Sequence, residues 1–420
     1  MAINISFEPT KYNVANAPIL YNVTSSLYNQ PQYQYVCDIK NTTGELLTRI
    51  KQYPNPNSTA TFDVARIVND YLEWSYNYFT ISGSFGLDKT DEYKDFEILF
   101  GEEYGTSLTS NVTLYDGNDV AGAPIITGSN SPISAWQGTV DVNNGLGWNW
   151  GDVYPTSSAT PLTNYPNSGV YSAKKEDNRN VVMSDYGIMG IYDPSDVAPP
   201  YTYKLYNSSN TLITSSVLDL TNSGSVLNYI PTGPQNLLSM GFTQGNLDDT
   251  SYYHIEYDTA LIAKYNLTDG CNYERVNFLF INSFGVWDNY GINLPVRKTT
   301  DIERKEITKP FIPWSETTPT YNQKNRGADY YRSMTTDRYI ISTQFLTDDT
   351  AYFVKDLIES PNVYLQVNNT KLKYGFTTQG VEFVPINITN SSYIWKTNPK
   401  NQRVFQYDIE YKFSNQRYSI

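Results

Sequence analysis

The sequence is poor in the side chains that carry most enzymatic chemistry. Its 420 residues contain one histidine and two cysteines. Cys37 and Cys271 lie far apart without metal-ligand spacing, so we expect both to be small buried apolar residues. His254 falls inside a predicted strand, where we expect a structural role rather than that of a ligand or base. This inventory leaves few options for Ser-His or Cys-His catalysis.

Known chemical motifs are also missing. The sequence has no Walker loop, no paired glycine-rich dinucleotide turn and no HExxH motif. Carboxylates remain, but the pairs Asp348-Asp349 and Asp248-Asp249 are interpreted as a helix start and a turn. The run Asp116-Gly-Asn-Asp119 lacks the spacing of a calcium loop, which favours another turn. We therefore expect no enzyme, with no catalytic, cofactor-binding or metal-binding residues and no cofactor.

Charge is scarce and mostly negative. Charged residues make up 17% of the chain, and the formal net charge is −13. A phosphate backbone would be repelled, and the longest basic patch, Arg297-Lys298 with Arg304-Lys305, is interrupted by glutamates. We expect no nucleic-acid partner, and the acidity is interpreted as serving solubility.

Long apolar runs are absent as well. No stretch approaches the roughly 18 uninterrupted apolar residues that a membrane helix needs, so we expect no membrane insertion. The first residues have neither a basic segment nor an apolar one, and we expect no secretory signal.

Aromatic residues are abundant instead, at 15% of the chain with 38 tyrosines. Together with Asn, Thr and Ser they favour strands, turns and broad contact surfaces. Strict alternation of apolar and polar residues across 403–413 predicts a strand with one buried face. Residues 392–397 are its predicted partner, and Asn398-Pro399-Lys400-Asn401 is the predicted turn.

We therefore predict a mainly β fold of tandem β-sandwich domains, Ig- or fibronectin-like, with a few short helices and a long loop-rich insertion. The predicted segments are an N-terminal sandwich (1–103), a loop-rich insertion or arm (104–198), a second sandwich (199–298), a Pro-containing linker (299–327) and a C-terminal β domain (328–420).

Two helices are predicted from apolar stripes. The first, over 64–74, follows Asp63 as N-cap and closes one end of the first sandwich. The second, over 348–359, follows Thr347 as N-cap and covers the C-terminal sheet.

The run Cys271 to Leu294 is the most distinctive in the chain. Its residues 275–281 predict a strand buried on both sides, and Gly285 and Asp288-Asn289 are the predicted reversal before a second strand over 290–294. We expect this hairpin to close the second sandwich.

Three stretches of the sequence resemble virion proteins of tailed phages that infect Bacteroidetes, including the crAss-like group. They are Tyr53-Pro-Asn-Pro56 followed by Phe62–Leu72, then Val276–Asp288, and then Leu357–Leu365 continuing into the last strand. Gly285-Val286 stands where the resemblance leads us to expect two glycines.

The resemblance implies a structural component of the virion, a tail protein or tail-attached ring or adaptor, that is built in the host cytoplasm. Its partners would be copies of itself in a ring and other tail proteins. We expect 104–180 and 299–327 to supply contacts between subunits.

Two other classes remain open. An adhesin that binds receptors or carbohydrates through exposed Trp and Tyr residues would contact surface glycans. A hydrolase of cell-surface polysaccharide would use carboxylates alone.

Overall fold

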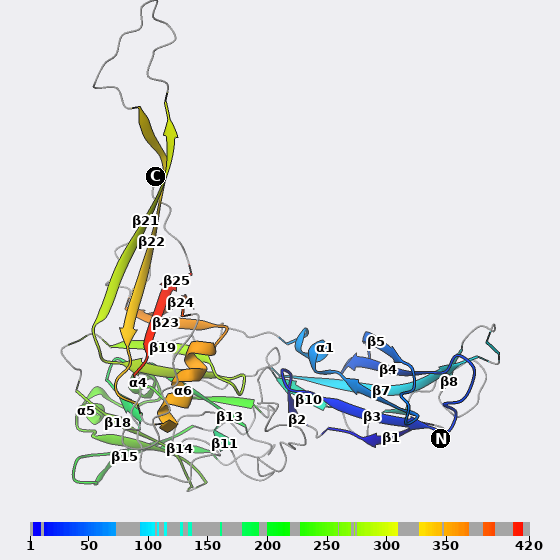
Figure 1. Ribbon diagram of the computed structural model, residues 1–420. Helices are drawn as coiled ribbons and strands as arrows, with labels where there is room; N and C mark the ends of the chain where they lie inside the picture. The colour runs from blue at the N-terminus through cyan, green and yellow to red at the C-terminus, as the bar shows by residue number, and fades with distance from the viewer. Residues whose placement is uncertain are drawn as a thin grey trace, which may run out of the picture. The chain divides into compact units, whose positions relative to one another are not determined.

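A computed structural model describes most of the chain. The described residues are 3–9, 12–72, 93–105, 107–108, 113–115, 127–128, 133–136, 160–161, 179–192, 200–218, 227–258, 260–269, 273, 275–309, 327–346, 348–368, 381–390 and 406–414. They form several, mostly antiparallel sheets with four short helices, which confirms the mainly β prediction (Figure 1). By its internal contacts the chain divides into two compact units, residues 1–268 with 281–288, and residues 269–280 with 289–420.

Two sheets of the first unit share one hydrophobic core. The smaller sheet has the order β1 (Ile3–Phe7), β3 (Leu20–Ser25) and β6 (Thr59–Asp63). The larger has the order β2 (Tyr12–Val14), β10 (Ile133–Trp136), β7 (Tyr93–Tyr104), β4 (Gln34–Asn41) and β5 (Leu46–Gln52), with β8 (Thr113–Tyr115) and β9 (Thr127–Gly128) also paired to β7. Alternate residues of both sheets are buried, and the ring of Phe100 lies 5.2 Å from Tyr21 and 5.7 Å from Phe62. The larger sheet thus packs its apolar face against the smaller one.

A second core in the same unit is built from two further sheets. One has the order β11 (Thr160–Pro161), β13 (Ile188–Tyr192) and β16 (Leu227–Pro231). The other has the order β12 (Arg179–Val181), β18 (Ala260–Leu267), β17 (Tyr252–Tyr257), β14 (Tyr201–Tyr206) and β15 (Leu212–Leu218). Tyrosines dominate this core, and the rings of Tyr253 and Tyr265 stack with centroids 5.2 Å apart.

Two helices that the sequence interpretation did not predict contribute to the second core. They are α4 (Pro234–Ser239), which has Pro234 in its first turn, and α5 (Gln244–Asp248), where Thr243 and Asn246 form a capping box. Leu237 of α4 and Leu247 of α5 are buried in this core.

The predicted hairpin after Cys271 is confirmed in its first strand and is wrong in the residues that form its turn. β19 (Val276–Ile281) is buried at every position. The reversal occurs at Asn282 to Val286, where Gly285 has φ of +77°, a conformation that favours glycine. Asp288 and Asn289, predicted as turn residues, belong to β20 (Trp287–Ile292), and Asp288 is buried.

Val286, where a second glycine was expected, fills space beside Gly190. A Cβ at position 190 would lie 2.7 Å from the Val286 side chain, so the two residues are matched in size.

The second unit is organised around one large sheet. Its order is β20, β19, β23 (Val363–Asn368), β24 (Val381–Ile388), β25 (Asp408–Phe413), β22 (Ala328–Ser342) and β21 (Val296–Thr308). Because β19 pairs with β23, the hairpin expected to close the second sandwich contributes its strands to this C-terminal sheet instead. The predicted partner strand of β25, over 392–397, lies outside the described residues, and β25 pairs with β22 and β24.

This sheet is strongly curled. β23 and β24 separate β19 from β25, which would place those strands roughly 14 Å apart in a flat sheet. Yet the rings of Phe278 and Tyr411 lie 5.7 Å apart. The face that carries both rings is therefore the inner face of the curl.

Helix α6 (Asp348–Glu359) covers the same face, as the sequence predicts. Phe353 packs its ring 5.3 Å from Phe280 and 5.8 Å from Tyr290. Ala351, Val354 and Leu357 are buried with it. The predicted N-cap, Thr347, lies outside the described residues.

The first predicted helix is shorter than expected. α1 covers only Ala65–Asn69, with Val64 as its N-cap. The Asp63 carboxylate accepts hydrogen bonds from the backbone N–H groups of Ala65 and Ile19, both at 3.1 Å. The helix ends at Asn69-Asp70, two residues that are poor helix formers and compete for backbone hydrogen bonds.

The prediction of a linker over 299–327 is wrong for residues 299–308. Residues up to Thr308 belong to β21, which is exposed along its whole length. A strand that buries neither face has no reason to alternate apolar and polar residues, so its sequence has linker-like composition. Residues 310–326 lie outside the described part.

Candidate assembly interface

The long hairpin of β21 and β22 is the most unusual surface of the described chain. β21 pairs with β22 from Val296 to Thr308, whereas β22 pairs with β25 only at Tyr339 to Ser342. Residues 296–308 and 328–338 are called the ribbon below. At roughly 3.3 Å per residue each strand of the ribbon is about 35–40 Å long. Figure 1 shows the ribbon extending beyond the rest of its sheet.

Surface interactions hold the two strands of the ribbon together. Lys298 and Asp337 form an ion pair at 2.7 Å, Arg338 and Asp301 another at 2.7 Å, and Lys309 and Asp329 a third at 2.6 Å at the far end. Each exposed pair contributes at most about 1 kcal/mol. An isolated two-stranded hairpin is marginally stable in water, so a ribbon of this length gains from a partner surface.

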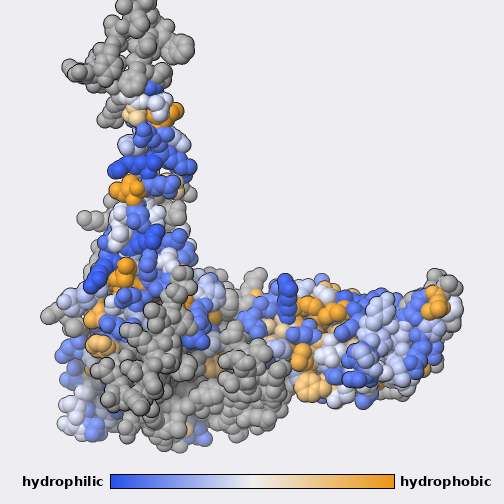
Figure 2. Space-filling model, viewed as in Figure 1, coloured by the Kyte–Doolittle hydropathy of each residue, from blue (hydrophilic) through white to orange (hydrophobic). Residues whose placement is uncertain are grey.

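Apolar side chains are exposed along the ribbon. Ile302 and Ile307 are each 51% exposed, and Tyr330 and Tyr331 are exposed still further. Figure 2 shows the ribbon as largely hydrophilic with separate hydrophobic patches. Interfaces between proteins combine such apolar and tyrosine anchors with a polar rim.

Charge also distinguishes this hairpin. The stretch 296–342 has nine Lys and Arg residues and six Asp and Glu residues, a net charge of +3. The whole chain carries −13, which leaves −16 on the remaining residues. The hairpin is thus complementary in charge to the rest of a second copy.

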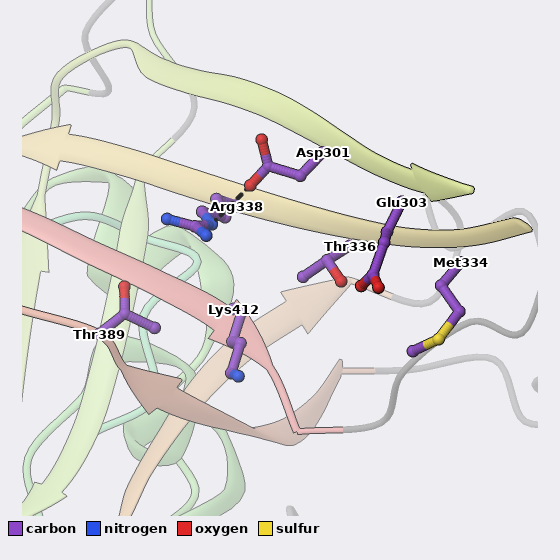
Figure 3. A pocket seen from close by; sticks show the side chains of 7 residues that line it. All are labelled: Asp301, Glu303, Met334, Thr336, Arg338, Thr389 and Lys412. Atoms are coloured by element: carbon purple, nitrogen blue, oxygen red, sulfur yellow. Dashed lines mark ion pairs between the residues drawn. The ribbon is translucent and has the colours of Figure 1, made fainter. Parts of the chain in front are cut away.

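A hollow of about 350 Å³ lies on one face at the base of the ribbon. It is lined by Asp301, Glu303, Met334, Thr336, Arg338, Thr389 and Lys412 (Figure 3). Arg338 is held by Asp301 and by Glu410, whereas Glu303 and Lys412 have no ion-pair partner among the described residues. The lining of the hollow therefore offers carboxylate and ammonium groups to a polar protein surface.

Within the described part of the chain, the residues singled out in the sequence lie in different elements. His254 lies in β17, between Lys204 and Lys264 on the neighbouring strands. Burial, and then the charge of Lys264, lower the pKa of its imidazole. Cys37 is fully buried, and burial raises the pKa of its thiol, which confirms the predicted apolar role; Cys271 lies outside the described residues.

The carboxylate pairs lie at helix ends. Asp348 begins α6, with Asp349 next to it, while Asp248 ends α5, and Asp249 is its C-cap. The predicted turn at Asp116 to Asp119 lies outside the described part of the chain. Within the described part, no cluster of three or more His, Cys, Asp or Glu side chains could hold a metal ion.

Glu102 is a buried carboxylate that the sequence interpretation did not single out. The Ser25 and Tyr33 hydroxyls donate to Glu102 Oε2 at 2.6 Å and 2.8 Å, and Glu102 is fully buried in β7. Burial raises the pKa of Tyr33, so this phenol stays protonated and donates. The alternating strand pattern places Glu102 on the inward face with Ile98 and Phe100, and this position was the available signal.

The structure describes only parts of the two segments that we expect to form subunit contacts. Of 299–327, residues 299–308 lie in the ribbon. Of 104–180, the structure describes only short pieces, and Trp148 and Trp150 lie outside them. No helix in the described chain is long and apolar enough to span a membrane.

The sequence matches no protein-family model, and no curated protein shows significant similarity to it.

Proposed function

We propose that this chain is a structural subunit that works by assembling with copies of itself. The observation that carries the proposal is the ribbon, a long two-stranded hairpin with apolar side chains exposed on a charged surface. The net charge of +3 on 296–342, against −16 elsewhere, favours the body of a neighbouring copy as the surface that the ribbon contacts. Such a contact joins two different patches, and rotation repeats it until a ring closes.

The sequence resemblance supports placing this assembly, in our proposal, in the tail of a phage virion, as a ring, adaptor or other tail component. In this proposal the partners are further copies and neighbouring tail proteins, and the protein is assembled in the host cytoplasm. Tandem Ig- or fibronectin-like sandwiches are the proposed domain type, supported by the pairs of sheets that face one another across the two cores of the first unit.

Sedimentation velocity over a range of concentrations tests the proposal. The informative variant removes 302–335 and joins Asp301 to Thr336 through Asn-Gly, a two-residue hairpin turn. Asp301 and Thr336 face one another in the native register, so the pairing of β22 with β25 is kept. We expect the natural chain to form closed oligomers as its concentration rises and the shortened chain to remain smaller at every concentration.

A substitution variant separates the loss of apolar contacts from the removal of residues 302–335. Ile302→Thr with Ile307→Thr keeps two strand-forming residues but removes exposed apolar area. We expect it to weaken assembly at least ten-fold while leaving the unfolding midpoint nearly unchanged. A shortened chain that assembles like the natural one would overturn the role of the ribbon. Saturable binding to a glycan array by a monomeric chain would favour an adhesin instead.

A further inference from the structure

The edge strand β15 lacks the usual protection against pairing with another strand. It ends the order of its five-stranded sheet, and no described strand pairs with its outer edge. Edge strands are commonly guarded by charged side chains. β5 carries Arg49 and Lys51, and β21 carries charges along its length, whereas β15 reads Leu-Ile-Thr-Ser-Ser-Val-Leu. Among the described edge strands of six residues or more, β15 is the one with no charged residue.

The side chains of β15 are accessible. Val217 is 58% exposed, Leu212 is 47% exposed, and Ser215 is exposed as well. Ile213 and Leu218 pack against the core of the sheet and anchor the strand. A bulge at Ile213 interrupts the pairing with β14 near one end, and Thr214 to Leu218 pair without interruption. A regular five-residue edge is therefore available.

In the uninterrupted part of β15, an antiparallel pairing of two strands about a two-fold axis at Ser215 sets Ser215 opposite Ser215 and Thr214 opposite Ser216. Both are hydroxyl pairs, which are favourable across neighbouring strands. Ile213 forms the bulge and Leu212 lies beyond it, so both are outside this regular pairing. No like charges face one another, although the chain as a whole carries −13.

We propose that β15 pairs antiparallel with β15 of a second copy about a two-fold axis through Ser215. The pairing joins two five-stranded sheets into one continuous sheet and supplies hydrogen-bond partners to both free edges. It is an isologous contact, in which the same strand is used on both sides. A single strand pair buries little surface, so the contact is weak and depends on concentration.

Cysteine cross-linking of the full chain tests the axis directly. With Ser215→Cys, the two introduced thiols face one another in adjacent strands, where Cα atoms lie about 4.5–5.5 Å apart. That separation permits a disulfide. With Val217→Cys, each thiol lies two residues from the axis, so the two thiols are roughly 14 Å apart along the strand. We expect S215C to form a disulfide dimer at least ten-fold faster than V217C under mild oxidation.

The natural chain, which carries the same Cys37 and Cys271 as both variants, supplies the background. Equal cross-linking of S215C and V217C would overturn the proposal, because both positions are exposed and random collision would link them alike.

A charge variant gives a second, reversible readout. Ser215→Lys places two ammonium groups opposite one another at the axis, and we expect the dimer dissociation constant to rise at least ten-fold in sedimentation experiments. Thr48→Lys adds the same charge on another edge strand, β5, and should leave the dimer dissociation constant unchanged. An S215K chain that dimerises like the natural one would contradict the pairing.

This contact goes beyond the assembly through the ribbon, and the two can fail separately. A chain without 302–335 keeps β15, so S215C should still cross-link in that background. Ring assembly without an S215C disulfide would refute only the β15 contact, and cross-linking without ribbon-dependent assembly would refute only the proposed function.

Discussion

Arg179 and Asp288 form an ion pair that is almost sealed from solvent. Their side chains are 6% and 1% exposed, their atoms Nη1 and Oδ1 are 2.9 Å apart, and 109 residues separate them in sequence. Burying two charges costs solvation energy that the pair must recover through its mutual attraction. The pair thereby fixes the position of the short strand β12 against the start of β20.

Breaking this pair should be costly. We predict that Asp288→Asn lowers the free energy of unfolding by about 3–5 kcal/mol, because the Arg179 charge stays buried without its counter-charge. The combined change Arg179→Met with Asp288→Leu should cost clearly less than Asp288→Asn. Urea denaturation measures the free energy of unfolding of both variants, provided that its slope against urea concentration is the same as for the natural chain.

The exposed pair at the end of the ribbon is the control. Asp329→Asn removes the partner of Lys309 in solvent and should cost less than about 1 kcal/mol. Equal losses for Asp288→Asn and Asp329→Asn would contradict the account of the buried pair.

At the scale of elements, the sequence predicted two elements that bury one regular face. Period-two alternation predicted the last strand, of which Asp408–Phe413 forms β25, and an apolar stripe located α6 at its observed bounds. These patterns exist because burial selects apolar side chains at fixed intervals.

Elements without such a face were missed. β21 is exposed on both sides, and α4 and α5 are too short to show a stripe. Pro234 and the Thr243 capping box were the only local signals of these two helices. The predicted contact segment 299–327 overlaps β21, one strand of the candidate interface. Pairing partners distant in sequence, such as β19 with β23, leave no local signal.

Helix α6 offers a test at this scale. We predict that Phe353→Ala lowers the free energy of unfolding by about 3–5 kcal/mol, because Phe353 is fully buried between the helix and the rings of Phe280 and Tyr290. Phe345→Ala is the matched control, since Phe345 is 77% exposed and should change stability by less than about 0.5 kcal/mol. Similar losses for both variants in chemical denaturation would show that α6 is not the cover of the sheet.

At the scale of the whole molecule, surface and charge are distributed as the proposed assembly requires. The chain as a whole is acidic, while the hairpin 296–342 carries a net positive charge and exposes apolar side chains. The ribbon and the β15 edge differ in kind: one is a charged surface that fits a different surface, and the other is an uncharged edge that fits itself. A chain with both contacts can close a ring and also join two copies across a two-fold axis.

Hydrogen exchange of the ribbon tests the central claim most directly. The amides of 296–308 and 328–338 should exchange quickly in the dilute chain, because a two-stranded ribbon is marginally stable alone. In concentrated, assembled protein we predict that their exchange slows at least ten-fold, while the buried strands β4 and β7 exchange equally slowly in both states. Ribbon amides that exchange at the same rate in the dilute and the assembled chain would contradict the account.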